Sequence, residues 1–168
     1  MIMNTLNQKD IRTLINEGNF NEVVNKYKKI VEIEPNNYKA HNNLGNALKE
    51  LGKLKEAATS YRKAIKIKSN YTKAYFNLGN ILNDFGKFKE AIASLLLALK
   101  INPNYNEAHN CLAISYKKLE KFEKAITHYK KANTSESRAQ ILQCLYILKK
   151  TNEYSKYLSK LCKDDPKN

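Results

Sequence analysis

Residues 41–64 read HNNLGNALKELGKLKEAATSYRKA, and residues 75–98 read YFNLGNILNDFGKFKEAIASLLLA. The two stretches start 34 positions apart and share several leucine, glycine and alanine positions. A repeat of about 20–50 residues is typical of proteins built by stacking small structural units. The sequence therefore predicts a repeat protein with a period of 34 residues.

The period extends beyond these two stretches. Four sets of positions share it across most of the chain: Leu44, Leu78 and Leu112; Gly18, Gly52 and Gly86; Ala57, Ala91 and Ala125; Ala64, Ala98 and Ala132. Within each copy the apolar residues recur every three or four positions, which is typical of amphipathic helices. Each copy is therefore expected to hold two helices, with the glycine ending the first because it tolerates a left-handed backbone.

The composition fits a folded helical chain. Of 168 residues, 42% are hydrophobic, five are glycine and three are proline, which excludes collagen-like and strongly disordered classes. The first ten residues lack the basic and apolar segments of an export signal, and no apolar run of about 18 residues follows. We therefore expect a cytoplasmic protein with no membrane partner.

The formal charge of +14 raises the possibility of a nucleic-acid partner. However, only three of the 30 basic residues are arginine, namely Arg12, Arg62 and Arg138. Bidentate phosphate contacts favour arginine, and no aromatic row accompanies the lysines for stacking on bases. This pattern disfavours nucleic acid and favours a lysine excess that follows genome composition.

The central copies resemble the tetratricopeptide repeat family, whose pattern is an aromatic residue, Leu-Gly, Tyr, then Ala, Phe and Pro. The best match, residues 72–105, carries Tyr75, Leu78, Gly79, Ala91 and Pro103. The resemblance implies an all-α fold, a right-handed α-α superhelix or solenoid of helix-turn-helix repeats. Residues 1–168 would form one array with copies at 4–37, 38–71, 72–105, 106–137 and 138–168, the first and last degenerate.

In this family the first helices of the copies line a concave groove that holds a peptide. The resemblance therefore implies a groove formed by Asn42, Asn43, Asn46, Lys73, Phe76, Asn77, Asn80, Asn110 and Ile114. Asparagine carries a donor and an acceptor, so a row of asparagines can pair with the backbone of an extended peptide. This row is similar to the asparagine ladder of O-linked N-acetylglucosamine transferases, and drift toward asparagine codons is the alternative explanation. We expect these side chains to point away from the interfaces between copies.

The outer helices differ in one copy. Three copies carry adjacent basic residues, at 28–29, 62–63 and 130–131, whereas the copy at 72–105 carries Leu96 and Leu97. An exposed leucine pair among lysines suggests a contact patch for self-association or for another domain. The alternative is that one leucine packs into the neighbouring copy and the other is an ordinary exposed apolar side chain.

The sequence offers no candidate active site. His41 and His109 occupy the aromatic position of the first helix, so we expect both to pack, whereas we expect His128 to face solvent. The sequence contains no nucleophile, zinc or nucleotide-binding motif, so we predict neither catalysis nor a cofactor.

These observations predict a protein-protein interaction module that binds a peptide or protein segment and acts as a scaffold or adaptor. One alternative is the amino-terminal recognition arm of a larger enzyme, such as a transferase or oxygenase. A weaker alternative is a basic nucleic-acid-binding array. The carboxylate clamp of some members of this family is disfavoured, because only two of its five residues are present in either register.

Overall fold

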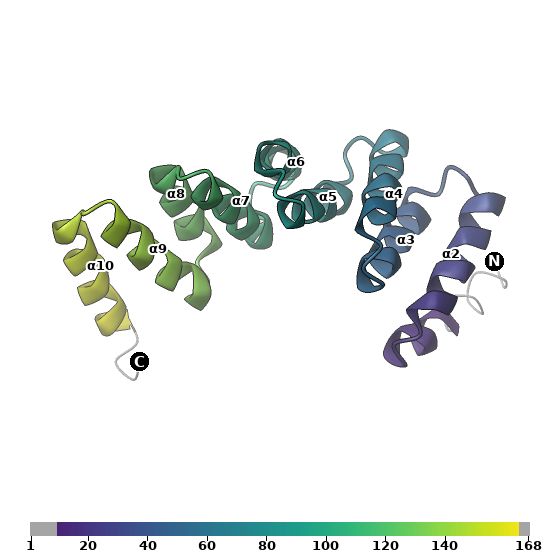
Figure 1. The fold of residues 1–168 in the computed structure, drawn as a ribbon, viewed down its shortest axis with the longest axis horizontal. Coiled ribbons are helices and arrows are strands. Elements are labelled where there is room, and N and C mark those ends of the chain that lie inside the picture. Colours follow the sequence, from purple (N-terminus) through teal and green to yellow (C-terminus); the bar gives the residue numbers. More distant parts are fainter. Residues whose placement is uncertain (1–9, 165–168) are drawn as a thin grey trace. The chain divides into compact units, whose positions relative to one another are not determined.

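The computed structural model describes residues 10–164, and every regular element in that range is an α-helix (Figure 1). Helical residues 10–16 are followed by α2 (Phe20–Ile33), α3 (Tyr38–Glu50), α4 (Leu54–Ile67), α5 (Thr72–Asp84), α6 (Phe88–Ile101), α7 (Asn106–Lys118), α8 (Phe122–Ala132), α9 (Ser135–Ile147) and α10 (Thr151–Asp164). These are the successive helices of an α-α solenoid, so the predicted fold class is confirmed. Residues 4–9 of the first predicted copy and 165–168 of the last lie outside the described range.

The chain forms two compact units, Met1–Leu82 and Asn83–Asn168. In the first unit α3 packs against α2 and α4. In the second, α7 packs against α6 and α8, α9 packs against α8, and α10 packs against α9. Packing between sequence neighbours is the hallmark of a solenoid. The single array over residues 1–168 stays a prediction.

The turns within the copies recur with the sequence period. Gly18, Gly52 and Gly86 have φ values of 71°, 71° and 70°, so the predicted left-handed turns are confirmed. The next copy has Glu120 at this position, with φ 57°. The turn therefore keeps its backbone geometry even where a side chain makes that geometry unfavourable.

Local sequence also explains why α9 starts earlier than the 34-residue period predicts. In the fourth copy α8 has 11 residues, whereas α4 and α6 have 14 each. Asn133 ends α8 with a left-handed φ of 50°, and Thr134 with Ser137 forms a capping box that starts α9. The shorter helix and the early cap therefore bring the start of α9 closer to α8 than the start of α5 is to α4 or that of α7 to α6.

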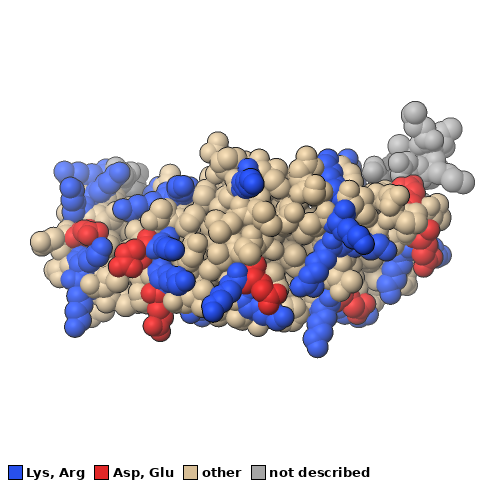
Figure 2. Space-filling view, turned by 90° about the horizontal axis from the view of Figure 1, so that it is seen from above, with Lys and Arg blue, Asp and Glu red and all other residues tan. Residues whose placement is uncertain are grey.

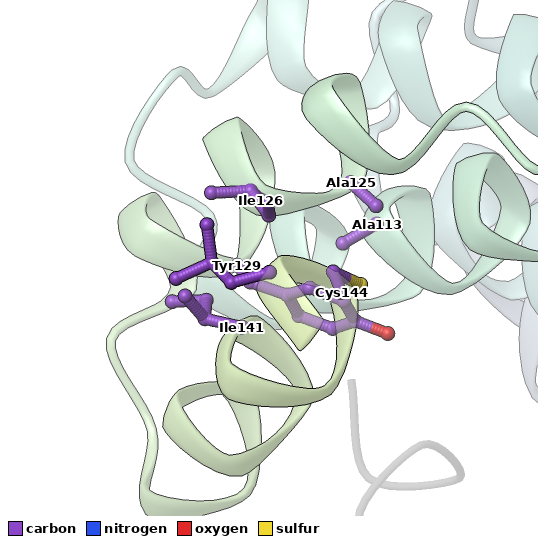
Figure 3. Packing of buried hydrophobic residues seen from close by; sticks show 7 residues of the cluster. Ala113, Ala125, Ile126, Tyr129, Ile141 and Cys144 are labelled. Carbon is purple, nitrogen blue, oxygen red and sulfur yellow. The ribbon is translucent and has the colours of Figure 1, made fainter. Parts of the chain in front are cut away.

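A buried tyrosine joins the two helices of a copy in each unit. Tyr61 on α4 is fully buried, and a Cβ atom added to Gly45 on α3 would lie 2.5 Å from its ring. In the second unit Tyr129 on α8 occupies the same repeat position. It packs against Ala113, Ile126, Ile141 and Cys144 (Figure 3).

We predict that Gly45→Ala lowers the unfolding free energy by about 1–2 kcal/mol, because overpacking against Tyr61 outweighs the better helix propensity of alanine. Urea unfolding followed by circular dichroism measures the change. The control repeats Gly45→Ala in a Tyr61→Leu background, since leucine stands at this repeat position in Leu95. An equal cost in both backgrounds would contradict the proposed contact.

Candidate functional site

The structure brings four of the predicted groove asparagines together in the first unit. The Asn77 amide nitrogen on α5 donates to the amide oxygens of Asn42 (3.0 Å) and Asn46 (3.1 Å) on α3. The Tyr61 hydroxyl also donates to the Asn46 oxygen, at 2.9 Å, and the Asn42 nitrogen donates to Asn43 at 3.4 Å. The amides thus form one network that spans two copies. The expectation that these side chains avoid the interface between copies is wrong for Asn77.

The other predicted residues of this unit differ in exposure. Asn42 is buried, with 2% of its surface exposed, whereas Asn46 and Lys73 are exposed. Phe76 and Asn80 are half-buried on α5. Within residues 10–164 the Asn80 amide has no hydrogen-bond partner. Its donor and acceptor are therefore available to a ligand.

A cavity of about 420 Å³ lies beside this network. Its apolar lining is Ile15, Phe20, Val23 and Ala47, and its polar lining is Tyr27, Asn43, Asn46 and Glu50. The Asn43 amide nitrogen donates to the Tyr27 hydroxyl at 3.2 Å, which joins α3 to α2. Sequence reasoning missed the contribution of the first copy because that copy matches the repeat pattern poorly. The apolar face of residues 11–24 was the available signal.

Asn110 and Ile114 lie on α7 in the second unit, where both line another cavity of about 420 Å³. Lys117, Phe122, Tyr129 and Gln140 contribute to the same lining, together with Lys118, Glu120 and Glu136. Lys117 donates to the side-chain oxygens of Gln140, at 2.7 Å, and Gln143. This cavity therefore combines apolar walls with several polar groups.

The two histidines in the aromatic position each bond the proline carbonyl near the end of the preceding copy. The His41 Nε2 atom lies 2.9 Å from the Pro35 carbonyl oxygen, and the His109 Nε2 atom lies 3.0 Å from that of Pro103. Both histidines are buried, so their predicted packing role is confirmed. A carbonyl can only accept, so each Nε2 atom carries the proton.

His128 does not face solvent, and that prediction is wrong. Its ring stacks on His109, with centroids 5.2 Å apart, and on Tyr116, at 5.6 Å. Its Nδ1 atom lies 3.0 Å from that of His109. Burial lowers the pKa of His128 to about 4, with contributions from His109 and Lys131. Burial also lowers the pKa of His109, so the pair is neutral near pH 7 and His128 donates to His109.

Neither cavity has a lining of one charge sign: Lys117 and Lys118 line the second together with Glu120 and Glu136, and Glu50 is the charged residue that lines the first. Figure 2 shows lysine and arginine side chains spread over the visible face with acidic side chains among them. Across residues 10–164, no three or more His, Cys, Asp and Glu side chains form a group that could hold a metal ion. The helices of the described range are too short or too polar to cross a membrane.

Leu96 and Leu97 on α6 are 43% and 44% exposed. Both leucines are therefore partly exposed on the surface.

Comparison with known proteins gives consistent family matches. Models described as TPR repeat match residues 45–84 and 79–120, and models described as tetratricopeptide repeat match residues 26–58 and 107–138. Together these matches run without a gap from residue 26 to residue 138. No curated protein matches this sequence.

Several solved structures share the fold. The MamA protein is 23% identical, with a TM-score of 0.86 over 97% of this chain and 92% of that one. A tetratricopeptide repeat protein from Parabacteroides merdae is 20% identical, with a TM-score of 0.82 over 98% and 67%. YrrB, described as a TPR protein with an unusual peptide-binding site, is 24% identical, with a TM-score of 0.73 over 83% and 75%.

The histidine pair predicts a pH-dependent stability. Both pKa values lie below the usual value of about 6.5, so the unfolded chain takes up protons before the folded chain does. The unfolding free energy should therefore fall by roughly 1–3 kcal/mol as pH decreases from about 6.5 to about 4.

Chemical denaturation across this pH range measures the effect. His128→Ser is the matched variant, because Ser60 and Ser94 occupy this repeat position in two other copies. The variant should lose part of the pH dependence while its carboxylates still titrate. Parallel curves for the two proteins would show that the pair does not cause the change.

Proposed function

Because the chain belongs to the tetratricopeptide repeat family, we propose that it is a non-enzymatic interaction module. It binds an extended segment of a partner protein along the first helices of its copies and acts as a scaffold or adaptor. The predicted site comprises Asn42, Asn43, Asn46, Lys73, Phe76, Asn77 and Asn80 in the first unit and Asn110 and Ile114 in the second.

One observation carries this proposal: the cavity in the first unit joins an apolar wall to the asparagine network. Ile15 and Phe20 offer a surface for an apolar side chain, and Asn43 and Asn46 place amide groups beside it. An extended peptide presents the same combination, since its side chains alternate with backbone donors and acceptors. Asn80 extends the polar surface with an unpaired amide.

The proposed row of asparagines is similar to the asparagine ladder of the O-linked N-acetylglucosamine transferases. The fold is also similar to that of YrrB, described as a TPR protein with an unusual peptide-binding site. An enzyme arm would use the same groove for a substrate segment. A nucleic-acid array would instead need a continuous basic surface, whereas the first cavity is lined by one acidic residue and the second by two lysines and two glutamates.

We predict that Ile15→Ala weakens peptide binding by about threefold to tenfold, because it removes part of an apolar wall worth roughly 1 kcal/mol. Peptides are first selected on the full chain from a library of random dodecapeptides, and fluorescence anisotropy then gives their affinities. Leu97→Ala is the matched control, since Leu97 is 44% exposed and Ile15 is 43% exposed. Phe76→Ala tests the other predicted anchor in the same way.

Circular dichroism confirms that each variant is folded. Loss of affinity in Leu97→Ala but not in Ile15→Ala or Phe76→Ala would place the binding surface on the outer helices. Oligonucleotides that bind more tightly than the selected peptides, with a steep salt dependence, would favour the nucleic-acid alternative.

The exposure of Leu96 and Leu97 favours a second proposal, that this outer-face patch mediates self-association or docking to another domain. Burying two leucines that are now partly exposed would stabilise such a contact by about 1–3 kcal/mol.

We predict that the double substitution Leu96→Lys with Leu97→Lys shifts any oligomer to monomer and leaves the unfolding free energy nearly unchanged. The substitution restores the basic pair of the other copies. Sedimentation velocity over a range of concentrations measures the change. A wild-type protein that is monomeric throughout, with no partner lost on substitution, would contradict the proposal.

A further inference from the structure

Two buried polar atoms lack a partner in the second unit. Among the described residues, neither the Tyr129 hydroxyl nor the Asn110 side-chain oxygen makes a hydrogen bond. Tyr129 is 1% exposed, and both residues line the same cavity. A buried polar atom without a partner carries a desolvation cost, so two at one cavity indicate a place for a polar ligand group.

The repeat shows which group is missing at Tyr129. Tyr27, Tyr61 and Tyr129 occupy the same position of their copies. The Tyr27 hydroxyl accepts from the Asn43 amide, and the Tyr61 hydroxyl donates to the Asn46 amide. In both earlier cases the partner is therefore a carboxamide.

The fourth copy has lost that partner. Ile114 stands 68 positions after Asn46, at the same position of its first helix, and it can neither donate nor accept. It packs instead against the apolar cluster that contains Tyr129. Figure 3 shows the Tyr129 oxygen pointing away from the other side chains of this cluster. Ile114 therefore cannot supply the amide partner that Asn46 supplies to Tyr61.

The same comparison explains Asn110. It stands at the position of Asn42, whose oxygen accepts from Asn77 of the following copy. In the last copy Gln143 takes the position of Asn77, but its side-chain oxygen accepts from Lys117. Asn110 therefore keeps a free acceptor beside the free donor of Tyr129.

We propose that this cavity binds a carboxamide group of the partner protein, whose C=O accepts from the Tyr129 hydroxyl and whose N–H donates to the Asn110 oxygen. Ile114 and Phe122 contact the carbon chain that carries the amide. The proposal rests on the peptide-binding function above and names one group that the partner must present.

The pair of atoms selects an amide over charged groups. A carboxylate or phosphate could accept from Tyr129 but would meet the lone pairs of Asn110, and an ammonium group could not accept from Tyr129. Burial raises the pKa of Tyr129, so its hydroxyl stays protonated and keeps its donor. The amide can come from an Asn or Gln side chain or from the peptide backbone.

The test compares Tyr129→Phe with wild type for peptides selected from the random dodecapeptide library on the full chain. Removing one hydrogen bond should weaken binding by about threefold to tenfold while the ring keeps the core packed. Ile114→Asn should also weaken binding, because its amide would accept from Tyr129 as Asn46 accepts from Tyr61. Tyr146→Phe is the control, since this tyrosine is 76% exposed and lines neither cavity, so the loss of its hydroxyl should not change affinity.

Substitutions in the peptide distinguish the two sources of the amide. Replacing Gln by Glu or Met removes a side-chain amide, and single N-methylation removes a backbone N–H. A loss from either one, abolished in Tyr129→Phe, supports the proposal and identifies the source. If neither change matters, the inference is wrong.

The same data separate this inference from the proposed function. Selected peptides that lose affinity in Ile15→Ala but bind Tyr129→Phe as they bind wild type would leave the groove standing and overturn the carboxamide site. A library that yields no peptide for the wild-type chain would overturn both.

Discussion

A buried tyrosine hydroxyl on the second helix of a copy must find a partner, and this requirement connects the packing of the copies to their polar surface. The Tyr61 ring fills the space that a side chain at Gly45 would need, so the two helices approach closely. Because the two helices are close, the Tyr61 hydroxyl on α4 reaches α3, where the Asn46 side-chain oxygen accepts from it. An unsatisfied buried hydroxyl costs about 1–3 kcal/mol, so the identity of the residue opposite the tyrosine matters for stability. The asparagines of the predicted groove are therefore part of the fold as well as candidates for binding.

This double role changes how substitutions in the groove should be interpreted. Asn46 accepts from both Tyr61 and Asn77, so its replacement by alanine would leave the buried Tyr61 hydroxyl without its partner and remove one of the two hydrogen bonds of the Asn77 amide. A loss of binding in such a variant would mix a local rearrangement with the loss of a ligand contact. Ile15 and Asn80 make no hydrogen bonds of this kind in the described structure, so their substitution does not disturb the network.

The structure also tests the explanation of the asparagines by codon drift. Asn19 and Asn37 cap α2 and α3, and Asn77 bonds both Asn42 and Asn46. These asparagines have specific structural partners, which random drift does not explain.

Much of the fold could be predicted from the sequence because its signals are local. The period, the apolar spacing and the glycine turns each depend on residues within one copy, and all three are confirmed. The sequence could not show contacts between side chains of different helices. His128 occupies a serine position and is expected from sequence to face solvent, but it stacks on His109 and on Tyr116, and two other copies carry Leu48 and Leu82 at the position of Tyr116. The repeat register predicts on which face of its helix Asn77 lies, but not which side chains it contacts. Its hydrogen bonds to Asn42 and Asn46 of the preceding copy could therefore not be predicted. The sequence did not predict the cavity lined by Ile15 and Phe20, because the first copy matches the repeat pattern poorly.

An array of similar copies contains its own comparisons, and departures from the repeat are therefore informative. Where a copy keeps both members of a pair, as with Tyr61 and Asn46, the polar groups satisfy each other and the pair stabilises the fold. Where the tyrosine is replaced, as with Leu95, the asparagine of the pair remains as Asn80, which is half-buried and without a partner in the described range. The fourth copy changes the other member: it keeps Tyr129 and replaces the asparagine by Ile114. Selection for stability alone would favour restoring the asparagine or losing the hydroxyl, since either change removes the desolvation cost. A half-changed pair that lines a cavity on the first-helix face is consistent with a cost that binding of a partner removes.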